Sequence, residues 1–418
     1  MQSICAAELC SGCEGCVNVC PQNAISMQGD IYGFMRPVVD NNRCIDCGLC
    51  VSICPAEKDI EAKYPQRVYA TYSKESKDRD SSASGGASSV LAKWFVNQGG
   101  VVYGCSQENA ETIHHIRIDN IKDLYRIKGS KYVQSIIGCT YKQIKEDLRN
   151  GLRVMFFGTP CQVAGLKSFM KDKCDNLLLI DICCHGVPSQ QLMLDNVRRI
   201  KECYHINYDN SQLRVAFRRK HPEVDFGFHV DAVQQSENPE IQYGFFFGGG
   251  CDSKSMHEVY GRLENKDYYI YGFLNGVFFR PNCYKCKYAV SNRVSDITLA
   301  DFWGLGRSDD PEMKERRGVS AVLLNTEKGK KLFEEIIDLV NYEERPVEEA
   351  IKGNPQLMHP YPLSDSHNVF MDLYPKVGFV KACRKSFGRR MLKNRMRAFL
   401  RSSLFITYRY RRIKYGSK

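Results

Sequence analysis

The sequence predicts a small α+β module held together by metal ions, followed by a larger α/β domain. Cysteines crowd the first sixty residues, and several apolar strands further along each run into a loop rich in glycine or cysteine. At 418 residues the chain is too long for one small core, so two or three domains are expected. A hydrophobic content of 43% is ordinary for a globular protein.

The N-terminal module is defined by two copies of one cysteine pattern, each followed by proline. The copies are Cys10-x2-Cys13-x2-Cys16-x3-Cys20-Pro21 and Cys44-x2-Cys47-x2-Cys50-x3-Cys54-Pro55. In such a run three thiolates bind one iron–sulfur cube, and the fourth reaches the other cluster. We therefore expect a ferredoxin-like dicluster module over residues 1–60 with two 4Fe-4S clusters. The ligands are Cys10, Cys13, Cys16 and Cys54 for one cluster, and Cys44, Cys47, Cys50 and Cys20 for the other.

Zinc is the alternative metal, because CxxC pairs also make tetrahedral zinc sites. Zinc would explain the pairs, but not the third and fourth cysteines at these gaps, followed twice by proline. The absence of a recognisable export signal also favours metal over disulfides.

The α/β part is predicted from strands that lead into loops. We expect strands at 67–70 and 101–103 with a helix at 90–97 between them. Three further strands run into loops, at 153–157 into Gly158-Thr159-Pro160-Cys161, at 177–182 into Cys183-Cys184-His185-Gly186, and at 297–300 into Asp301-Phe302-Trp303-Gly304. Ligands of open α/β sheets bind beyond the carboxyl ends of strands, so these loops are the expected site.

Four cysteines outside the module could bind a third cluster. Cys283-Tyr284-Lys285-Cys286 is a separate CxxC, and Cys161 and Cys184 lie in loops after strands. The alternative is that all four are buried packing residues. Either member of the Cys183-Cys184 pair could face the site. The remaining cysteines, Cys5 included, show no partner pattern and are expected to pack.

Two polar loops could contact a nucleotide. Ser84-Gly85-Gly86 precedes a helix, where backbone N–H groups and the helix dipole favour a phosphate. The alternative is a flexible linker. The run from Gly129 to Ser135 combines a cation, a phenol and an amide, as in a site loop or a solvated surface.

The net charge of +11 comes from the end of the chain. Residues from Leu373 to Lys418 include 15 Lys or Arg and no acidic residue, so the rest is mildly acidic. This composition favours a basic helix that binds an anionic membrane surface or an acidic partner; a solvated extension is the alternative. No nucleic-acid fold signature accompanies it. With no apolar run of about 18 residues and no leader pattern, we expect a cytoplasmic protein, peripheral at the membrane if the tail binds there.

Taken together, the loops resemble the coenzyme F420 hydrogenase/dehydrogenase beta-subunit family, in the family's order, over residues 67–310. The matching segments are 84–86, 129–134, 158–166, 184–189, 280–286 and 295–304. The resemblance implies an α/β flavin-binding domain that holds FAD. It divides residues 67–310 into a family N-terminal region at 67–145 and a family C-terminal region at 150–310. Beyond the resemblance, we expect a helical extension at 311–375 and a basic tail at 376–418.

The resemblance also implies the roles of individual residues. It makes Cys161, Cys184, Cys283 and Cys286 the ligands of the third cluster. The residues expected to contact flavin or substrate are Ser84, Gly85, Gly86, Ser130, Lys131, Tyr132, Gln134, Gly158, Thr159, Arg280 and Asp301. His185 and Tyr132 are candidate proton donors, although His185 could equally be a core residue and Asp301 could cap a turn.

Clusters move single electrons, whereas flavin exchanges one or two. We therefore expect an iron–sulfur flavoprotein oxidoreductase that relays electrons between a ferredoxin-type donor or acceptor and an FAD-linked two-electron substrate. The alternative is a non-catalytic electron-transfer subunit of a larger redox complex. The expected partner is a redox protein or a small-molecule electron carrier.

Overall fold

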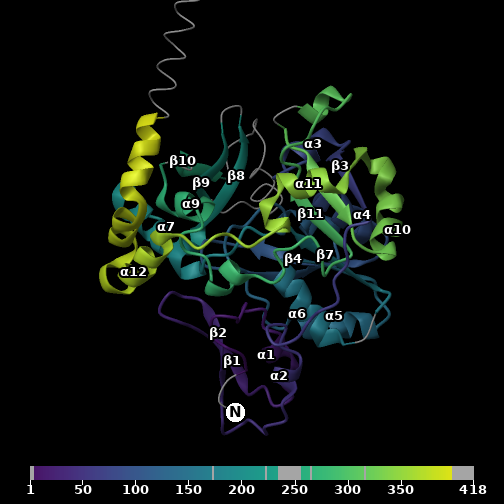
Figure 1. The fold of residues 1–418 in the computed structure, drawn as a ribbon, viewed down its shortest axis with the longest axis horizontal. Helices are drawn as coiled ribbons and strands as arrows, with labels where there is room; N and C mark the ends of the chain where they lie inside the picture. The colour runs from purple at the N-terminus through teal and green to yellow at the C-terminus, as the bar shows by residue number, and fades with distance from the viewer. Residues whose placement is uncertain are drawn as a thin grey trace, which may run out of the picture.

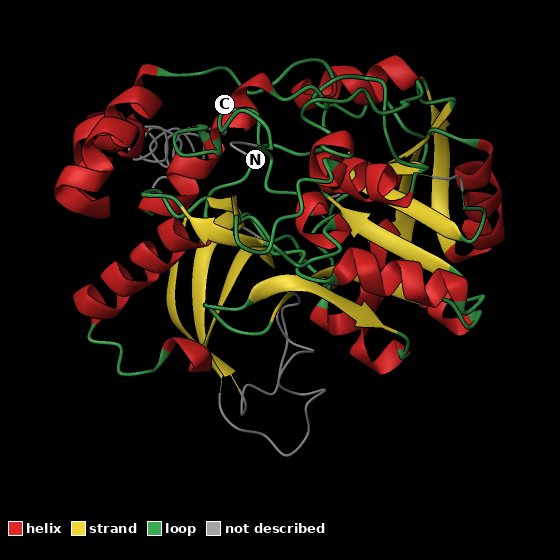
Figure 2. Ribbon diagram, turned by 90° about the horizontal axis from the view of Figure 1, so that it is seen from below, coloured by secondary structure: helices red, strands yellow, loops and turns green. Residues whose placement is uncertain are grey.

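The computed structural model describes residues 4–171, 174–221, 224–233, 256–263, 266–314 and 317–397. Figure 1 shows the N-terminal module at one end of the molecule, below a central sheet and a second, smaller sheet. Figure 2 shows the two sheets beside one another, with helices packed around them.

The N-terminal module has little apolar core. Its elements are α1 (Gly15–Val19), β1 (Ile25–Gly29), β2 (Met35–Val39) and α2 (Leu49–Ser52), with β1 and β2 antiparallel. Its small buried cluster contains Ile4, Ile25 and Cys50, with several of the predicted ligand cysteines packed against it. Cysteine side chains therefore occupy the place that apolar residues fill in an ordinary core.

The central sheet contains the strands expected from the sequence. Its order is β13-β3-β12-β11-β7-β6-β4-β5, and β11, β7, β6 and β4 are parallel to their neighbours in that group. The expected strands are confirmed as β3 (Arg67–Ser73), β4 (Val101–Gln107), β6 (Val154–Gly158), β7 (Leu177–Ile182) and β11 (Ile297–Asp301). Antiparallel β5 (Ile113–Ile118) closes one edge. The carboxyl ends of the parallel strands therefore meet at one edge of the sheet.

Helices cover both faces of this sheet. Along β6, Val154 and Phe156 pack on one side with α5 (Thr140–Arg149) and α6 (Pro160–Met170), while Met155 packs on the other with α4 (Ala87–Asn97) and α10 (Glu327–Ile336). The alternation follows from the period of two in a strand. α6 begins with a capping box, in which the Thr159 amide donates to the Gln162 side chain at 3.0 Å, and with Pro160 in its first turn.

The second sheet lies in the region where the sequence pattern was least clear. Antiparallel β8 (Leu213–His221), β9 (Val224–Val233) and β10 (Met256–Leu263) pair in the order β10-β9-β8. They share one core with α7 (Gln190–Tyr204), α9 (Tyr268–Leu274) and α12 (Asp365–Cys383). The 15-residue helix α7 was not predicted.

The expectation of a helical extension over 311–375 is wrong. This segment supplies two strands of the central sheet, β12 (Ser320–Leu324) and β13 (Val340–Arg345), besides α10, α11 (Val347–Gly353) and much of α12. All five residues of β12 are buried between β3 and β11, as a fully enclosed strand requires. The regions 67–145 and 150–310 likewise contribute to one sheet, so they are parts of a single domain.

The basic tail begins inside α12 rather than before a separate helix. α12 turns at Gly378, where φ is 77° and ψ 171°, and helical backbone then continues through a π-helical turn (Arg384–Gly388) to Arg397. The apolar and basic run at 400–406 lies outside the described residues. α3 (Ser76–Asp80) and the 3-10 turns at Ile121–Arg126, Asn210–Gln212, Pro281–Lys285, Pro311–Lys314, Ile337–Leu339 and Pro355–Leu357 complete the fold.

Candidate functional site

The predicted ligands of one ferredoxin cluster gather at the outer end of the module. Cys20, Cys44, Cys47 and Cys50 line one small cavity together with Pro21 and Ile45. The Cys47 side chain is exposed, and Ile45 is 61% exposed beside it. This cysteine set, the outer set, is therefore the one nearest to solvent.

The other ferredoxin ligands form an inner set of four cysteines, Cys10, Cys13, Cys16 and Cys54. The pKa of Cys13 is raised to about 12, mainly by burial and to a smaller extent by the thiols of Cys161, Cys10 and Cys54. Burial likewise raises the pKa of Cys16, with contributions from the other three thiols. These mutual effects indicate that the four thiols lie close to one another, and their assignment to one cluster stays a prediction.

Cys5, which was expected to be a packing residue, lies against the inner set. A hydrogen bond from Cys5 is the main cause that lowers the pKa of Cys10 to about 5 and that of Cys54 to about 7. The sequence offers no signal for this contact because Cys5 stands outside both runs.

The four cysteines of the candidate third cluster also converge, and we call them the cavity set: Cys161, Cys184, Cys283 and Cys286. Burial raises the pKa of Cys184, and the thiols of the other three raise it further. Burial raises the pKa of Cys286 to about 11, with Cys161 the next cause. Among the described residues no three His, Cys, Asp or Glu side chains form a group suited to a single metal ion.

The inner set and the cavity set are neighbours. The thiol of Cys161 is one of the charges that raise the pKa of Cys13. One helical turn after Cys161, a Cβ built on Gly165 would lie 2.9 Å from both Cβ and Sγ of Cys13. Glycine at 165 therefore lets α6 approach the ferredoxin module closely.

Buried polar contacts fix the ferredoxin module against the α/β domain. The Glu14 carboxylate is 5% exposed and accepts hydrogen bonds from the backbone amides of Ile137 and Gly138, both at 2.9 Å. Asn18 donates to the carbonyl of Gly138 at 2.8 Å. Burial raises the pKa of Glu14. The module is thus docked by satisfied buried groups, which fix its orientation.

A cavity of about 780 Å³ opens at the carboxyl edge of the central sheet. Most of the residues predicted to contact flavin or substrate line it, and so do both candidate proton donors and two cysteines of the cavity set. These residues are Ser84, Gly86, Ser130, Lys131, Tyr132, Gln134, Gly158, Thr159, Cys161, Cys184, His185 and Asp301.

Two of the predicted cofactor residues, Gly85 and Arg280, are not part of this lining. A Cβ on Gly85 would collide with the Thr71 carbonyl and lie 2.7 Å from the Ser320 amide, so Gly85 packs on the sheet. Arg280 contacts the ferredoxin module instead, with Nε donating to the Cys10 carbonyl at 2.7 Å. Gln134 lines the cavity and also contacts the ferredoxin module, because its side-chain amide donates to the Ser11 carbonyl at 2.9 Å.

Aromatic rings form one part of the cavity wall. Tyr132 stacks on Phe273 with centroids 4.4 Å apart, and His185 lies 4.9 Å from the ring of Tyr361. Among the described residues no hydrogen-bond partner reaches the buried His185 Nε2, and burial lowers the pKa of this imidazole. His185 is therefore neutral near pH 7.

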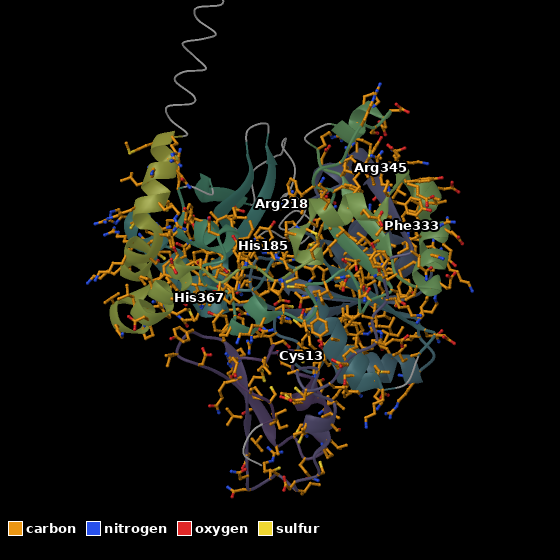
Figure 3. All side chains as sticks on the ribbon, viewed as in Figure 1. Cys13, His185, Arg218, Phe333, Arg345 and His367 are labelled. Carbon is orange, nitrogen blue, oxygen red and sulfur yellow. The ribbon has the colours of Figure 1, made fainter. Side chains whose placement is uncertain are left out.

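Basic residues line the other parts of the cavity. Lys128 Nζ lies 2.6 Å from Asp78 Oδ1 near the start of α4, and Arg218 Nη1 lies 2.6 Å from Asp301 Oδ2. Figure 3 places Arg218 near His185 and above Cys13. Burial lowers the pKa of Lys131 to about 8. Neither Lys128 nor Arg218 belongs to a motif that the sequence analysis identified. Both lie at the cavity because of how the strands and loops of the domain are arranged.

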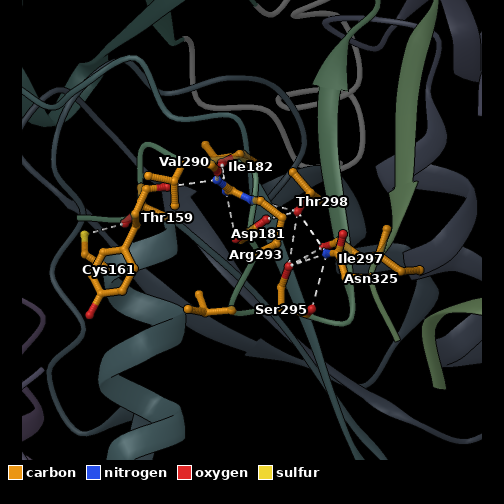
Figure 4. Close-up of polar contacts among 12 residues, drawn as sticks. Thr159, Cys161, Asp181, Ile182, Val290, Arg293, Ser295, Ile297, Thr298 and Asn325 are labelled. Atoms are coloured by element: carbon orange, nitrogen blue, oxygen red, sulfur yellow. Dashed lines mark hydrogen bonds and ion pairs between the residues drawn. The ribbon is translucent and has the colours of Figure 1, made fainter. Parts of the chain in front are cut away.

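A buried network supports the cavity set from behind (Figure 4). Arg293 pairs with Asp181 at 2.9 Å, and Thr298 donates to the other Asp181 oxygen at 2.5 Å. Arg293 Nη1 also donates to the carbonyls of Tyr288 and Val290, at 2.9 and 3.2 Å. Asp181 is the penultimate residue of β7, which ends just before the Cys183-Cys184 pair, so this network ties the loop after Cys286 to that strand.

The module and the site define an iron–sulfur protein whose dicluster ferredoxin module is docked on an α/β domain. The family model for the C-terminal part of the coenzyme F420 hydrogenase/dehydrogenase beta subunit matches residues 151–350, and that of the 4Fe-4S dicluster domain matches residues 9–58. Residues 151–350 are therefore similar to the C-terminal part of this beta subunit, and a dicluster ferredoxin domain precedes them in the chain.

Relatives with related sequences match the ferredoxin module. Ferredoxin-3 of Chlorobaculum tepidum is 39% identical over 61 residues, which are 13% of this chain and 90% of that protein. A polyferredoxin-like protein of Methanocaldococcus jannaschii is 38% identical over 76 residues, which are 16% of this chain and 45% of that protein. The chain thus spans less than half of the second relative.

Among solved structures, a chain of the F420-reducing nickel–iron hydrogenase complex from Methanosarcina barkeri is similar. It has a TM-score of 0.41 and 17% identity, and the match covers 70% of this chain and 90% of that one. Within the described part of the chain, no helix has the length and apolar character that a membrane crossing requires.

Proposed function

We propose that this protein is an iron–sulfur flavoprotein that exchanges electrons between a one-electron redox partner and a two-electron substrate. The observation that carries the proposal is the composition of the cavity wall, in which the loops expected to contact flavin stand beside Cys161 and Cys184. When bound, the clusters supply one-electron transfer and FAD exchanges one or two electrons.

The cavity fits FAD in size and in chemistry. Its volume of about 780 Å³ lies within the range of small-molecule sites. Lys128 and the start of α4, an 11-residue helix preceded by Gly86, would hold the phosphates. The stacked Tyr132 and Phe273 would pack against the planar ring. The unpartnered His185 Nε2 is a buried polar atom that a ligand can satisfy.

Three cysteine sets would hold three 4Fe-4S clusters between the surface and the cavity. The outer set includes the exposed Cys47, the inner set contains Cys13 beside Cys161, and the cavity set includes Cys161 and Cys184 on the cavity wall. We infer that the redox partner binds at the exposed end of the ferredoxin module.

Two side chains are proposed to act on protons at the cavity. Neutral His185 can accept a proton at Nε2, and the Tyr132 phenol can donate one, since both line the cavity. Lys131 and the Arg218–Asp301 pair would orient an anionic group of the substrate or cofactor. Coenzyme F420 is a candidate substrate because the family is named for it.

The test is anaerobic purification followed by quantitation of iron, sulfide and flavin. We expect about twelve irons and one FAD per chain, with the flavin spectrum bleached by a one-electron reductant. About eight irons with FAD present would remove the third cluster from the proposal. Cluster-loaded protein without flavin would refute the flavoprotein.

The alternative of a non-catalytic electron-transfer subunit stays open. It makes a different prediction for the isolated chain, which would hold clusters but turn over no two-electron substrate. Turnover of coenzyme F420 or an artificial two-electron acceptor by the isolated chain would exclude that alternative.

The basic helix is proposed to bind an anionic membrane surface. Its exposed cations are Lys381, Arg384, Lys385, Arg389, Arg390, Lys393, Arg395 and Arg397. Leu392 and Met396, one turn apart, are 56% and 59% exposed, as in a helix that lies in a membrane interface. Vesicles with and without anionic lipid, at low and high salt, test this role. Equal binding to neutral vesicles, or none at all, would contradict it.

A further inference from the structure

Arg280 is a buried guanidinium without a carboxylate partner. Its side chain is 0% exposed, and no Asp or Glu of the described residues lies within ion-pair distance of it. The other deeply buried arginines in the described part of the chain differ in this respect. Arg79 pairs with Glu312 at 2.5 Å, and Arg293 pairs with Asp181 at 2.9 Å.

The oxygen atoms that accept hydrogen bonds from Arg280 among the described residues all belong to neutral carbonyl or amide groups. Nε donates to the Cys10 carbonyl at 2.7 Å, Nη1 to Gln134 Oε1 at 2.8 Å, and Nη2 to the Met35 carbonyl at 2.6 Å. The ring of Phe34 lies 5.7 Å from Cζ. These contacts satisfy the N–H groups but give the positive charge no carboxylate partner among the described residues, which is costly in a buried site.

The position of Arg280 identifies the missing countercharge. Nη2 lies 3.7 Å from Sγ of Cys10, a ligand of the inner set. Burial raises the pKa of two members of the cavity set, Cys161 and Cys283, and the charge of Arg280 partly offsets this effect. The guanidinium thus stands between two groups of thiols that become thiolates when iron binds.

Other charged groups nearby do not replace Arg280. Arg36, the next cation, is offset by Asp30 at 3.2 Å. The buried carboxylate of Glu14 is held by two backbone amides. Gly12 leaves room for the arrangement, because a Cβ there would lie 2.8 Å from Arg280 Nη1 and 2.7 Å from Gln134 Nε2.

We propose that Arg280 is the fixed positive charge that tunes the clusters of the inner set and the cavity set. An added electron makes a thiolate-bound cluster more negative, so a buried cation at this distance stabilises the reduced form. Arg280 thereby raises the midpoint potentials of both clusters relative to that of the outer set. The part concerning the cavity set rests on the proposed third cluster; the part concerning the inner set does not.

The experiment is a redox titration of the anaerobic holoprotein, followed by electron paramagnetic resonance. Arg280→Gln removes the charge while keeping an amide that can donate hydrogen bonds. We expect the equilibrium constant for reduction of the inner-set cluster to fall by at least about tenfold. For one electron, this makes the midpoint potential about 59 mV more negative. The outer-set midpoint should stay unchanged.

Two further variants separate charge from packing. Arg280→Lys keeps the positive charge. The equilibrium constant for reduction of its inner-set cluster should stay within about tenfold of the wild-type value. Gln134→Met removes one acceptor of Arg280 without changing any charge, and should shift the potential less than Arg280→Gln. If Arg280→Gln fails to load its clusters, Arg280→Lys must still load them.

The proposal is overturned if the Arg280→Gln midpoints match the wild type, or if Arg280→Lys behaves like Arg280→Gln. Failure of the Arg280 proposal can be told apart from failure of the proposed flavoprotein function. Wild-type protein with only two clusters would remove the cavity set, yet the inner-set potential would still test Arg280.

Discussion

Gly165 of α6 lies directly against Cys13 of the ferredoxin module, with room for a hydrogen but not for a methyl group. A Cβ at 165 would stand 2.9 Å from Sγ of Cys13. The same helix carries Cys161 one turn earlier, so one surface of α6 presents a proposed ligand and the contact surface for another cluster. Close approach matters here because electron transfer requires neighbouring centres.

Gly165→Ala should therefore disturb the inner set. The added methyl group overpacks a buried contact, at a cost of about 1–3 kcal/mol, and we expect loss of iron from the ferredoxin module. Iron content and urea unfolding of anaerobic protein measure this. Gly388→Ala is the matched control, because a Cβ there would lie 3.7 Å from its nearest neighbour. Equal iron content in the two variants would contradict the prediction.

Cys184→Ser and Cys183→Ser should differ in iron content. The pKa of Cys184 is raised by burial and by the other thiols of the cavity set. The pKa of Cys183 is also raised by burial, but the charges that act on it are those of Arg293, Asp181 and Asp301. We expect Cys184→Ser to lower the iron content from about twelve to about eight per chain, and Cys183→Ser to leave it unchanged. The reverse result would assign the ligand to Cys183.

Asp181→Asn should destabilise the domain strongly. It leaves Arg293, which is 2% exposed, as a buried charge without its carboxylate, at a cost of about 3–5 kcal/mol. The exposed pair Lys376–Asp372 provides the control, since Lys376→Met should change stability by less than about 1 kcal/mol. Urea unfolding at pH 7 measures both variants, and similar effects would refute the role of the buried pair.

His115 should make stability depend on pH. Burial lowers its pKa to about 4, while Nε2 lies 2.9 Å from the Phe157 carbonyl. Below about pH 6.5 the unfolded chain binds a proton that the folded protein does not, so stability falls as the pH decreases toward 4. The loss should approach about 3 kcal/mol across that window.

Unfolding of His115→Gln between pH 5 and 7.5 checks this expectation, because the variant should show a flatter pH dependence. His205→Gln, at an exposed helix end, serves as the control. If both variants keep the wild-type slope, another group causes the dependence.

The sequence was informative wherever the chemistry is local. The two cysteine runs predict both the ferredoxin module and the pairing of distant cysteines, because cluster geometry dictates the spacing. The strands at 153–157, 177–182 and 297–300 were predicted correctly from continuous apolar runs that end in polar loops.

Other features depend on contacts between distant segments. After the buried Val340, β13 alternates between partly buried and exposed residues, three of them charged, so nothing local predicts that it pairs with β3. The family resemblance placed Arg280 at the cofactor. Its contacts with Cys10 and Met35 arise only when the ferredoxin module docks. Lys128 and Arg218 reach the cavity through the topology of the α/β domain, which places them beside Asp78 and Asp301.

The exposure of Cys47 and Ile45 at the tip of the molecule has a practical consequence for handling the protein. Oxygen and chelators will reach the outermost cube first, because the inner set contains the buried Cys13 and none of its four thiols is exposed. Brief exposure to air should therefore yield a partly degraded preparation that still contains its inner centres but has lost its contact with external electron carriers.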